Sequence, residues 1–511
     1  MPCRQPGVWF KVGLFILLFI ISAGVRLPNI STSLSDPYDT PTALVLVVLD
    51  VWSADGALKN KFLPRVTYPG QTNRYVLSSG VRLMNKEGIG YYTSSPPFSL
   101  ILAYLVHRVL NMDATVVSMR LLNLVLGLIA ALFFYEMMLL VLPTSEYRRK
   151  ISLIGTVLFI FAAPHLWYFS QLYSWHIVWE YCWIATLYFV FRILSFEGKA
   201  GNIRRSLFYL GLANFLAVYS DFQGVLASLV IMSYACFVLG ERPVAKGIFY
   251  SCCISTIAAL IITIVQYSSI SGFSGLIDAL EHIAFFRSSL AAGTNFWLIV
   301  AYHYVSAYAL LLLYVISLLL LIMLPKENRG RVYFDSKEKG FLYLTLLPVL
   351  IQHGLFLSWC AIHPSSILRA GVFICGSIVV LSNVFRRTPA GWELRNWEKI
   401  LKNALIIVVL AYSVWQYYEK YGHAVQPGGF AVLGEEIRRK ARNDEIVFMA
   451  PGRRVWMPLV YYSKRNIQGV SSDADAISWM ITRNLHKGVV FHVNGDLIVE
   501  KISRVVADVK E

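Results

Sequence analysis

The segments NISTSLSDPYDT (residues 29–40) and YYTSSPPFSLILAYLVHRVL (residues 91–110) bracket the stretch that decides the fold of this chain. It follows the first apolar run and carries two acids, Asp36 and Asp39, ahead of a segment headed by Pro96 and Pro97. Acids beside a hydrophobic helix, followed by an amphipathic segment, indicate a site where lipid meets water. This interpretation requires the rest of the chain to lie in a membrane.

The composition meets that requirement. Of the 511 residues, 57% are hydrophobic and only 15% are charged, and the mean hydropathy is +0.57. A water-soluble core cannot bury so much apolar surface, so the composition indicates an α-helical polytopic membrane protein. The seven cysteines lie outside the large polar segments, so we expect no disulfide framework.

Apolar runs long enough to cross about 30 Å of hydrocarbon recur along the chain. We predict about eleven transmembrane helices, at residues 8–25, 119–142, 150–165, 174–194, 206–220, 222–240, 247–267, 297–324, 340–359, 367–385 and 401–419. Residues 8–25 have a basic flank but no small-residue cleavage site, which predicts a retained first span and a cytoplasmic N-terminus.

The distribution of Lys and Arg orients these spans. The short loops on the cytoplasmic side are all basic if residues 97–112 form an interfacial helix on the outer face instead of another span. The net charge of +16 then comes largely from inner-loop anchors, which predicts membrane lipids and no nucleic acid as partners. The outer segments are 26–118, 165–175, 268–296 and the tail.

The predicted domains are a transmembrane domain over residues 1–420, whose first outer loop is 26–118, and a small extracytoplasmic α/β domain over 421–511. The tail alternates helical periods with the short apolar strands IVFMA, NIQGV and VVFHV, and it ends in DLIVEKISRVVADV, which predicts an amphipathic helix over 496–509. It has no glycine-rich phosphate loop, so we interpret it as a packing or acceptor-contact module.

A first span ending in Arg26-Leu27-Pro28, the acid-bearing loop, the Pro-Pro-headed segment, the basic-flanked bundle and the α/β tail together resemble a GT-C glycosyltransferase. The most similar group is that of the bacterial protein mannosyltransferases and aminoarabinose transferases. The resemblance implies a donor sugar on a polyprenyl phosphate, a catalytic base at Asp39 or Asp36, and a donor site shaped by Pro96 and Pro97. Aminoarabinose transferases have Lys immediately before these prolines, where this chain has Ser95, so that lysine's phosphate-binding role is not carried over.

Glycosyl transfer itself requires a carboxylate to accept the proton of the attacking hydroxyl. We prefer Asp39 as this base, with Asp36 as its neighbour; the alternative is that either acid only caps the next helix. Asp221, at a tight turn between two predicted spans, is a second candidate with the same capping alternative. Glu180 lies inside a predicted span, where a carboxyl is either functional or paired, here with His176.

The phosphate leaving group requires cations at the outer face. Arg287 and Arg369 each adjoin an apolar stretch, His363 flanks an outer turn, and Lys86 lies in the first loop. Arginine matches phosphate through its planar fork, although each of these residues could instead anchor lipid headgroups. No His-based metal spacing is present, so a metal-free reaction is our default, but Asp36 and Asp39 could hold a divalent cation such as Mg²⁺ or Mn²⁺.

With the resemblance, the sequence therefore predicts a hexosyl- or pentosyltransferase, and the resemblance to bacterial members implies the inner membrane. The enzyme would move a sugar from a polyprenyl-phosphate donor to a lipid, lipid-linked glycan or protein acceptor at the outer face, with inversion at the anomeric carbon. A transporter or flippase would show two related halves and charges along a path; no internal repeat is evident, and the polar residues gather on one face. A non-catalytic scaffold is a third possibility, which replacement of the acids would distinguish.

Overall fold

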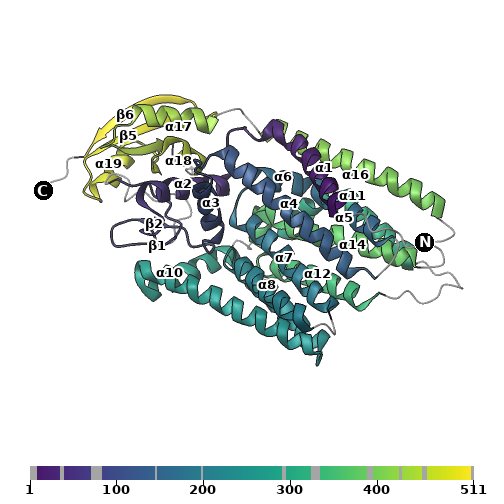
Figure 1. Cartoon of the computed structure of the whole chain (residues 1–511). Helices are drawn as coiled ribbons and strands as arrows, with labels where there is room; N and C mark the ends of the chain where they lie inside the picture. The colour runs from purple at the N-terminus through teal and green to yellow at the C-terminus, as the bar shows by residue number, and fades with distance from the viewer. Residues whose placement is uncertain are drawn as a thin grey trace.

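The computed structural model describes residues 8–34, 39–70, 83–143, 147–196, 200–289, 295–323, 334–387, 395–424, 429–451 and 457–507. A body of long helices carries a small sheet at one end (Figure 1). The helices of the body are α1 (Val8–Arg26), α2 (Thr40–Asp55), α3 (Phe98–Val109), α4 (Val116–Val141), α5 (Arg148–Phe161), α6 (Ala163–Gln171), α7 (Trp175–Ser195), α8 (Ala200–Val218), α9 (Gln223–Ser233), α10 (Pro243–Ser289), α11 (Phe296–Met323), α12 (Ser336–Leu355), α13 (Leu357–Ile362), α14 (Ala370–Arg386) and α16 (Arg395–Ala424). Short helical segments η1 (Leu27–Asn29), η3 (Tyr234–Leu239) and η4 (Pro364–Arg369) join some of them.

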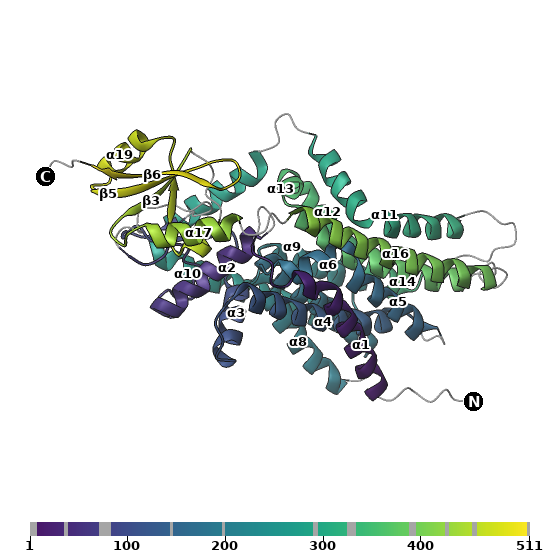
Figure 2. The ribbon, with the colours of Figure 1, turned by 90° about the horizontal axis from the view of Figure 1, so that it is seen from above.

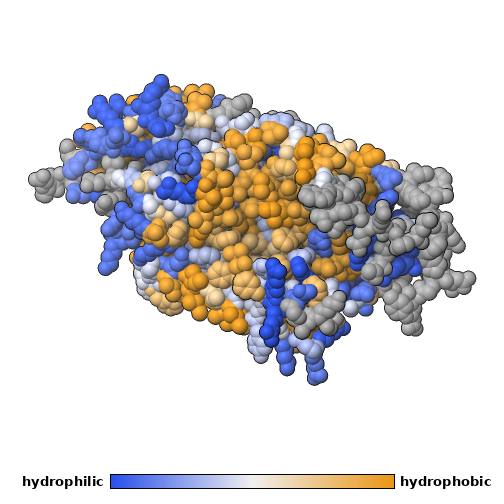
Figure 3. All heavy atoms as spheres, in the orientation of Figure 1, coloured by the Kyte–Doolittle hydropathy of each residue, from blue (hydrophilic) through white to orange (hydrophobic). Residues whose placement is uncertain are grey.

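Each of the predicted apolar runs contains a helix. Within the described residues, five helices are long and apolar enough to cross a membrane, or six if α5 and α6, which meet at a bend of 58°, form one broken span. Apolar atoms cover the middle of the helical body, whereas the end that carries the sheet is largely hydrophilic (Figure 3). The chain is therefore a helical membrane protein, and the count of eleven spans stays a prediction.

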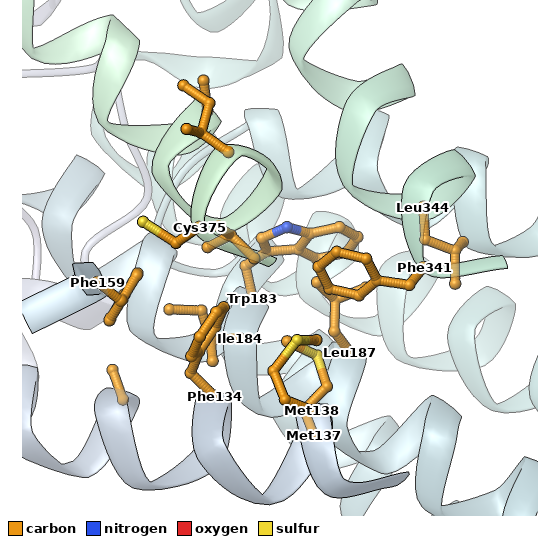
Figure 4. Packing of buried hydrophobic residues seen from close by; sticks show 14 of the residues in the cluster. Phe134, Met137, Met138, Phe159, Trp183, Ile184, Leu187, Phe341, Leu344 and Cys375 are labelled. Atoms are coloured by element: carbon orange, nitrogen blue, oxygen red, sulfur yellow. The ribbon is translucent and has the colours of Figure 1, made fainter. Parts of the chain in front are cut away.

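The core of the body lies where α4, α5, α7, α12 and α14 meet (Figure 4). Phe134 of α4 stacks on Phe159 of α5 with ring centroids 4.7 Å apart. Phe341 of α12 packs against α14 at Gly376, where an added Cβ would lie 2.1 Å from the Phe341 ring. These helices are therefore closely packed against one another.

The first outer loop contains helices as predicted. The segment predicted as interfacial forms α3, and the apolar stretch after Asp39 forms α2. A short antiparallel hairpin, β1 (Leu83–Met84) and β2 (Gly90–Tyr91), packs beside α10. The outer segment 268–296 is helical as far as Ser289, since α10 continues through a break at Gly272, whose φ is 80°. The interfacial position of α3 stays a prediction.

The tail forms a mixed sheet with flanking helices: α17 (Gly429–Lys440), β3 (Ile446–Ala450), α18 (Met457–Ser463), β4 (Ile467–Gly469), α19 (Asp473–Ile481), β5 (Lys487–Val493) and β6 (Val499–Val506). The strand order is β4-β3-β5-β6, with β3 parallel to both neighbours and β6 antiparallel to β5. The prediction of a final helix over 496–509 is therefore wrong. Val499, Ile502 and Val505 are spaced three residues apart, as on one face of a helix. These residues are β-branched, however, and as a strand they pair with the otherwise open edge of β5.

The sheet lies against the first outer loop, as two views of the ribbon agree (Figures 1 and 2). Tyr462 accepts a hydrogen bond from the Leu34 amide at 2.8 Å, and Asn466 accepts one from the Tyr68 amide at 3.1 Å. Lys464 forms an ion pair with Asp50 of α2. These polar contacts join the first outer loop to the tail at the end of the molecule that carries the sheet. The division into domains at residue 420 stays a prediction.

Gly224 fixes how closely α9 approaches α8, and this generates a first prediction. A Cβ at this position would lie 2.6 Å from Val218 Cα and 2.7 Å from its amide nitrogen, and backbone atoms cannot rotate out of the way. We expect Gly224→Ala to destabilise the protein by roughly 3 kcal/mol, the upper end for overpacking. Thermal unfolding of the purified protein in detergent measures this.

The matched control is Gly354→Ala in α12, where an added Cβ meets nothing within 4 Å. We expect its melting temperature to equal or slightly exceed that of wild type, because Ala favours a helix over Gly. Equal melting temperatures for the two variants would show that the α8–α9 approach is not tight.

Candidate active site

Asp39, the preferred base, immediately precedes α2 and is buried, with 6% of its surface exposed. It occupies the N-cap position, yet its carboxylate makes no capping hydrogen bond. Oδ2 instead lies 3.7 Å from Nη2 of Arg120 in α4. The capping alternative therefore does not account for the Asp39 side chain. Asp36 lies outside the described residues.

Arg120 holds the segment that leads to Asp39. Its Nη1 donates hydrogen bonds to the carbonyl oxygens of Asn29, Ile30 and Thr32, at 3.1, 3.1 and 2.7 Å. The guanidinium is buried, with 1% of the side chain exposed. Arg120 is not among the predicted site residues; the signal for it is a lone arginine at the start of an apolar run, where a buried charge is costly unless it is paired or functional.

The turn between α6 and α7 joins the Asp39 region to the rest of the site. The Tyr173 amide donates to Thr42 Oγ1 at 3.0 Å, and the Tyr173 hydroxyl donates to the Ser99 carbonyl at 2.7 Å. Tyr173 is completely buried. It therefore fixes the start of α2 and the start of α3 against the start of α7.

Asp221 and His176 form a close pair across this junction. Asp221 Oδ2 contacts His176 Nδ1, while Trp175 Nε1 donates to His176 Nε2 at 2.9 Å. Because Nε2 accepts that bond, Nδ1 carries the proton donated to Asp221. The alternative that Glu180 pairs with His176 is wrong: Glu180 is buried, and among the residues that the structure describes neither of its carboxylate oxygens has a hydrogen-bond partner.

The electrostatics of Asp221 favour the ionised form. Burial by itself would raise the pKa of this carboxyl, but His176 and Arg369 outweigh it, together with the Gln223 amide that donates to Oδ1 at 3.0 Å. The net effect lowers the pKa below its ordinary value. The nearest guanidinium nitrogen of Arg369 is 3.9 Å from Oδ2. Asp221 is therefore a carboxylate within a hydrogen-bonded cluster.

Two of the predicted phosphate contacts join this cluster. Arg369 ends η4 with its guanidinium 4.6 Å above the Trp179 ring, and its buried Nη1 has no hydrogen-bond partner among the described residues. His363, which precedes η4, is exposed and lies 4.9 Å from Trp359, whose ring is 5.2 Å from His176. Asp221 and Arg369 are thus brought together, and His363 is connected to them through the rings of Trp359 and His176.

The Pro-Pro segment reaches the same turn from the other side. After Pro96 and Pro97, the Phe98 amide donates to the Tyr219 carbonyl at 3.1 Å, two residues before Asp221. Tyr267 of α10 donates to the Ser95 carbonyl at 2.9 Å. The first outer loop is therefore bonded directly to the α8–α9 turn.

Two predicted cations are not placed in this cluster. Lys86 is exposed in the turn between β1 and β2. Arg287 belongs to α10, but its side chain lies outside the described residues. Both assignments stay predictions.

Two cavities, one apolar and one very small, lie near the Pro-Pro segment and Arg369. An apolar one of about 410 Å³ lies between α3, α4, α7 and α8, with Phe98, Leu102 and Phe133 among its lining residues. A small one of about 10 Å³ lies beside Arg369 and Trp179. The small cavity has room for about one water molecule, so it is too small to hold a phosphate group as it stands.

Metal binding stays unassigned. Within the described ranges, which omit Asp36, no group of three or more His, Cys, Asp or Glu residues could hold a metal ion. Asp39 has the Arg120 guanidinium as a charged neighbour, 3.7 Å from Oδ2.

Comparison with solved structures identifies the architecture. The oligosaccharyltransferase of Archaeoglobus fulgidus, solved with Zn and sulfate, aligns over 93% of this chain and 67% of that chain, with 13% identity and a TM-score of 0.58. The mycobacterial arabinofuranosyltransferase AftD aligns over 94% of this chain and 36% of that chain, with 13% identity and a TM-score of 0.52. This chain has the GT-C glycosyltransferase fold.

ArnT from Cupriavidus metallidurans also aligns, over 97% of this chain and 98% of that chain, with 11% identity and a TM-score of 0.47. No protein-family model matches the sequence, and no curated protein sequence matches it significantly.

The buried Asp39–Arg120 pair generates a second prediction. Arg120→Met leaves the Asp39 carboxylate buried without its facing guanidinium, so we expect a loss of about 3–5 kcal/mol, as for other buried pairs that lose one partner. The double variant Asp39→Asn/Arg120→Met should recover part of this loss, because it no longer buries a charge. Thermal unfolding of both variants in detergent tests the coupling.

Arg108→Met is the control, because Arg108 is an exposed arginine at the end of α3. It should unfold close to wild type. A double variant no more stable than Arg120→Met would mean that Arg120 acts only through the carbonyl oxygens of residues 29–32.

The lowered pKa of Asp221 generates a third prediction. The ionised carboxylate stabilises the folded state above the ordinary Asp pKa of about 3.9, and this contribution is lost as the pH falls through the lower folded-state value. We expect the melting temperature of wild type to be higher than that of Asp221→Asn at about pH 7. The difference between the two melting temperatures should shrink as the pH falls toward about pH 3. A difference that stays constant across this range would contradict ionisation of Asp221 as its source.

Proposed function

We propose that this chain is a polyprenyl-phosphate-dependent glycosyltransferase. It would transfer a hexosyl or pentosyl group to a lipid, lipid-linked glycan or protein acceptor at the outer face of the inner membrane. The GT-C fold supports the class of reaction, and the archaeal oligosaccharyltransferase of this fold has been solved with dolichol-phosphate and an inhibitory peptide. The observation that carries the proposal is the Asp39 carboxylate, which is buried beside Arg120 and does not cap α2.

In the proposed reaction, Asp39 accepts the proton of the acceptor hydroxyl while the hydroxyl oxygen attacks the anomeric carbon. The bond from that carbon to the phosphate oxygen breaks, and the polyprenyl phosphate leaves with the bonding electrons. Direct displacement inverts the configuration at the anomeric carbon. Arg120 would orient Asp39, since its Nη2 lies 3.7 Å from the carboxylate and its Nη1 is bonded to the segment that leads to Asp39.

The leaving phosphate needs donors that are not already engaged. Arg369 supports this role because its Nη1 makes no hydrogen bond within the described residues, while its other side faces Asp221 and Trp179. His363 is exposed nearby and could contact the same group. Asp221 and His176 would then position Arg369 and leave proton transfer to Asp39.

The donor's hydrocarbon chain needs an apolar site next to the reacting group. The cavity of about 410 Å³ beside Phe98 has that character and lies between helices that face lipid. Its end near Phe98 adjoins the Pro-Pro segment and the α8–α9 turn. We propose that the polyprenyl chain enters here, with Pro96 and Pro97 shaping the passage toward Arg369.

A divalent cation stays a secondary proposal. The archaeal oligosaccharyltransferase was solved with Zn. In this chain the oxygen ligands would have to come from Asp39 and Asp36, and when bound the ion would offset charge on the donor phosphate.

The fourth prediction concerns transfer itself. In membranes supplied with radiolabelled polyprenyl-phosphate sugars, we expect Asp39→Asn to lower transfer to any acceptor by about 10²–10⁴-fold, the usual contribution of a general base. Asp113→Asn is the matched control, because Asp113 is an exposed acid in the loop between α3 and α4. It should retain wild-type transfer. The protein level of each variant is measured in the same membranes.

Transfer that is unchanged in Asp39→Asn would remove the base assignment. Transfer that is absent from wild type with every sugar donor tested would favour the alternative functions, a lipid-linked sugar transporter or a non-catalytic scaffold. Movement of labelled lipid-linked sugar across the membrane of vesicles that contain the protein would then indicate the transporter, and no movement would indicate the scaffold.

A further inference from the structure

A second, larger groove lies on the other side of η4 from the Asp221 cluster. Its volume is about 630 Å³, and it runs between α6, α11, η4 and α16. Six aromatic side chains line it: Trp167, Tyr168, Tyr302, Tyr412, Trp415 and Tyr417. Tyr302 and Trp415 are 69% and 56% exposed, so the groove opens to the surroundings of the protein. It is distinct from the apolar cavity beside Phe98.

The polar groups of the groove are uncharged or acidic. Gln416 donates to the Tyr412 hydroxyl at 2.8 Å, His303 contacts the Ala361 carbonyl at 2.9 Å, and Glu419 is exposed. None of the described lining residues is Lys or Arg. A phosphate group would meet a carboxylate here and no cation, so the groove does not suit a lipid phosphate.

Aromatic faces alternating with hydrogen-bonding groups do suit a sugar. A pyranose ring presents C–H bonds on its faces and hydroxyl groups at its edge, so it can pack on an indole or phenol ring while its hydroxyls meet amide and carboxylate oxygens. The volume of the groove falls within the range of small-molecule sites, about 300–1,000 Å³. Several sugar units fit such a space.

The groove is also connected to the proposed reaction centre. Pro364 and Ile367 of η4 form part of its wall, and the same short helix ends at Arg369 and follows His363. A molecule in the groove therefore lies one helical segment away from the groups assigned to the donor phosphate. Tyr308 of α11 points its hydroxyl at the Ile367 carbonyl, 3.4 Å away, which fixes η4 against α11.

We propose that this groove binds the acceptor and that the acceptor is a neutral glycan. This inference rests on the proposed transferase function for its biological meaning, but sugar binding itself requires neither donor nor turnover. Among the acceptor classes left open by the fold, it selects one that carries an oligosaccharide. The donor would then approach from the Phe98 side and the acceptor from the α11–α16 side of η4.

Saturation-transfer NMR on the full chain in lipid nanodiscs, without any donor, tests this inference. The probes are neutral hexasaccharides of glucose, mannose, arabinose and N-acetylglucosamine. We expect at least one of them to bind, and Trp415→Ala to weaken that binding by roughly three- to tenfold, as expected for one lost aromatic contact. The matched control is Trp297→Ala, which removes another exposed tryptophan of the outer face, 60% exposed and outside the groove lining.

Binding that is weakened by Trp415→Ala but not by Trp297→Ala supports the inference. The absence of binding by all four probes, or equal binding in wild type and Trp415→Ala, overturns it. Neither result depends on the transfer assay, so an inactive protein that binds sugar contradicts the proposed function alone, and an active protein that binds none of the probes contradicts only the groove.

Discussion

The hydrogen bonds of Tyr173 are the constraint on which the rest of the site depends. Its amide and hydroxyl are buried, and a buried polar group that lacks a partner costs about 1–3 kcal/mol. Thr42 and Ser99, both from the first outer loop, supply the partners. Asp39 stands just before Thr42, and His176 stands just after Tyr173. The need to satisfy one buried tyrosine therefore sets the position of both polar clusters.

Each cluster places a carboxylate near an arginine in apolar surroundings. Asp39 faces Arg120, and Asp221 faces Arg369. The arginines differ in which guanidinium nitrogen lacks a hydrogen bond among the described residues: at Arg120 it is Nε, while Nη1 donates to backbone carbonyl oxygens, whereas at Arg369 it is the terminal Nη1. This difference is the physical reason for assigning the first pair to proton transfer and the second to the phosphate. A guanidinium whose N–H groups already donate to backbone oxygens has fewer donors left for a ligand.

Patterns within short stretches of sequence predicted the features that depend on neighbouring residues, such as helices. Long apolar runs became helices, and the acids at helix ends, Asp39 and Asp221, proved to lie in polar clusters. The pairings themselves were not predictable, because His176 and Asp221 are 45 residues apart and Arg120 meets a carboxylate from a different helix. The last strand was mistaken for a helix because its apolar spacing fits both, and only the free edge of β5 decides between them.

The contacts between the tail sheet and the first outer loop impose an order on biosynthesis. Tyr462, which accepts the Leu34 amide, follows it by 428 residues. At about 5–20 residues per second, the ribosome needs roughly 20–90 s to bridge that interval. During this time Leu34, Asp50 and Tyr68 have already been made, while their partners have not. The loop that carries the preferred base therefore lacks these contacts until α18 and the turn before β4 have been made and meet it.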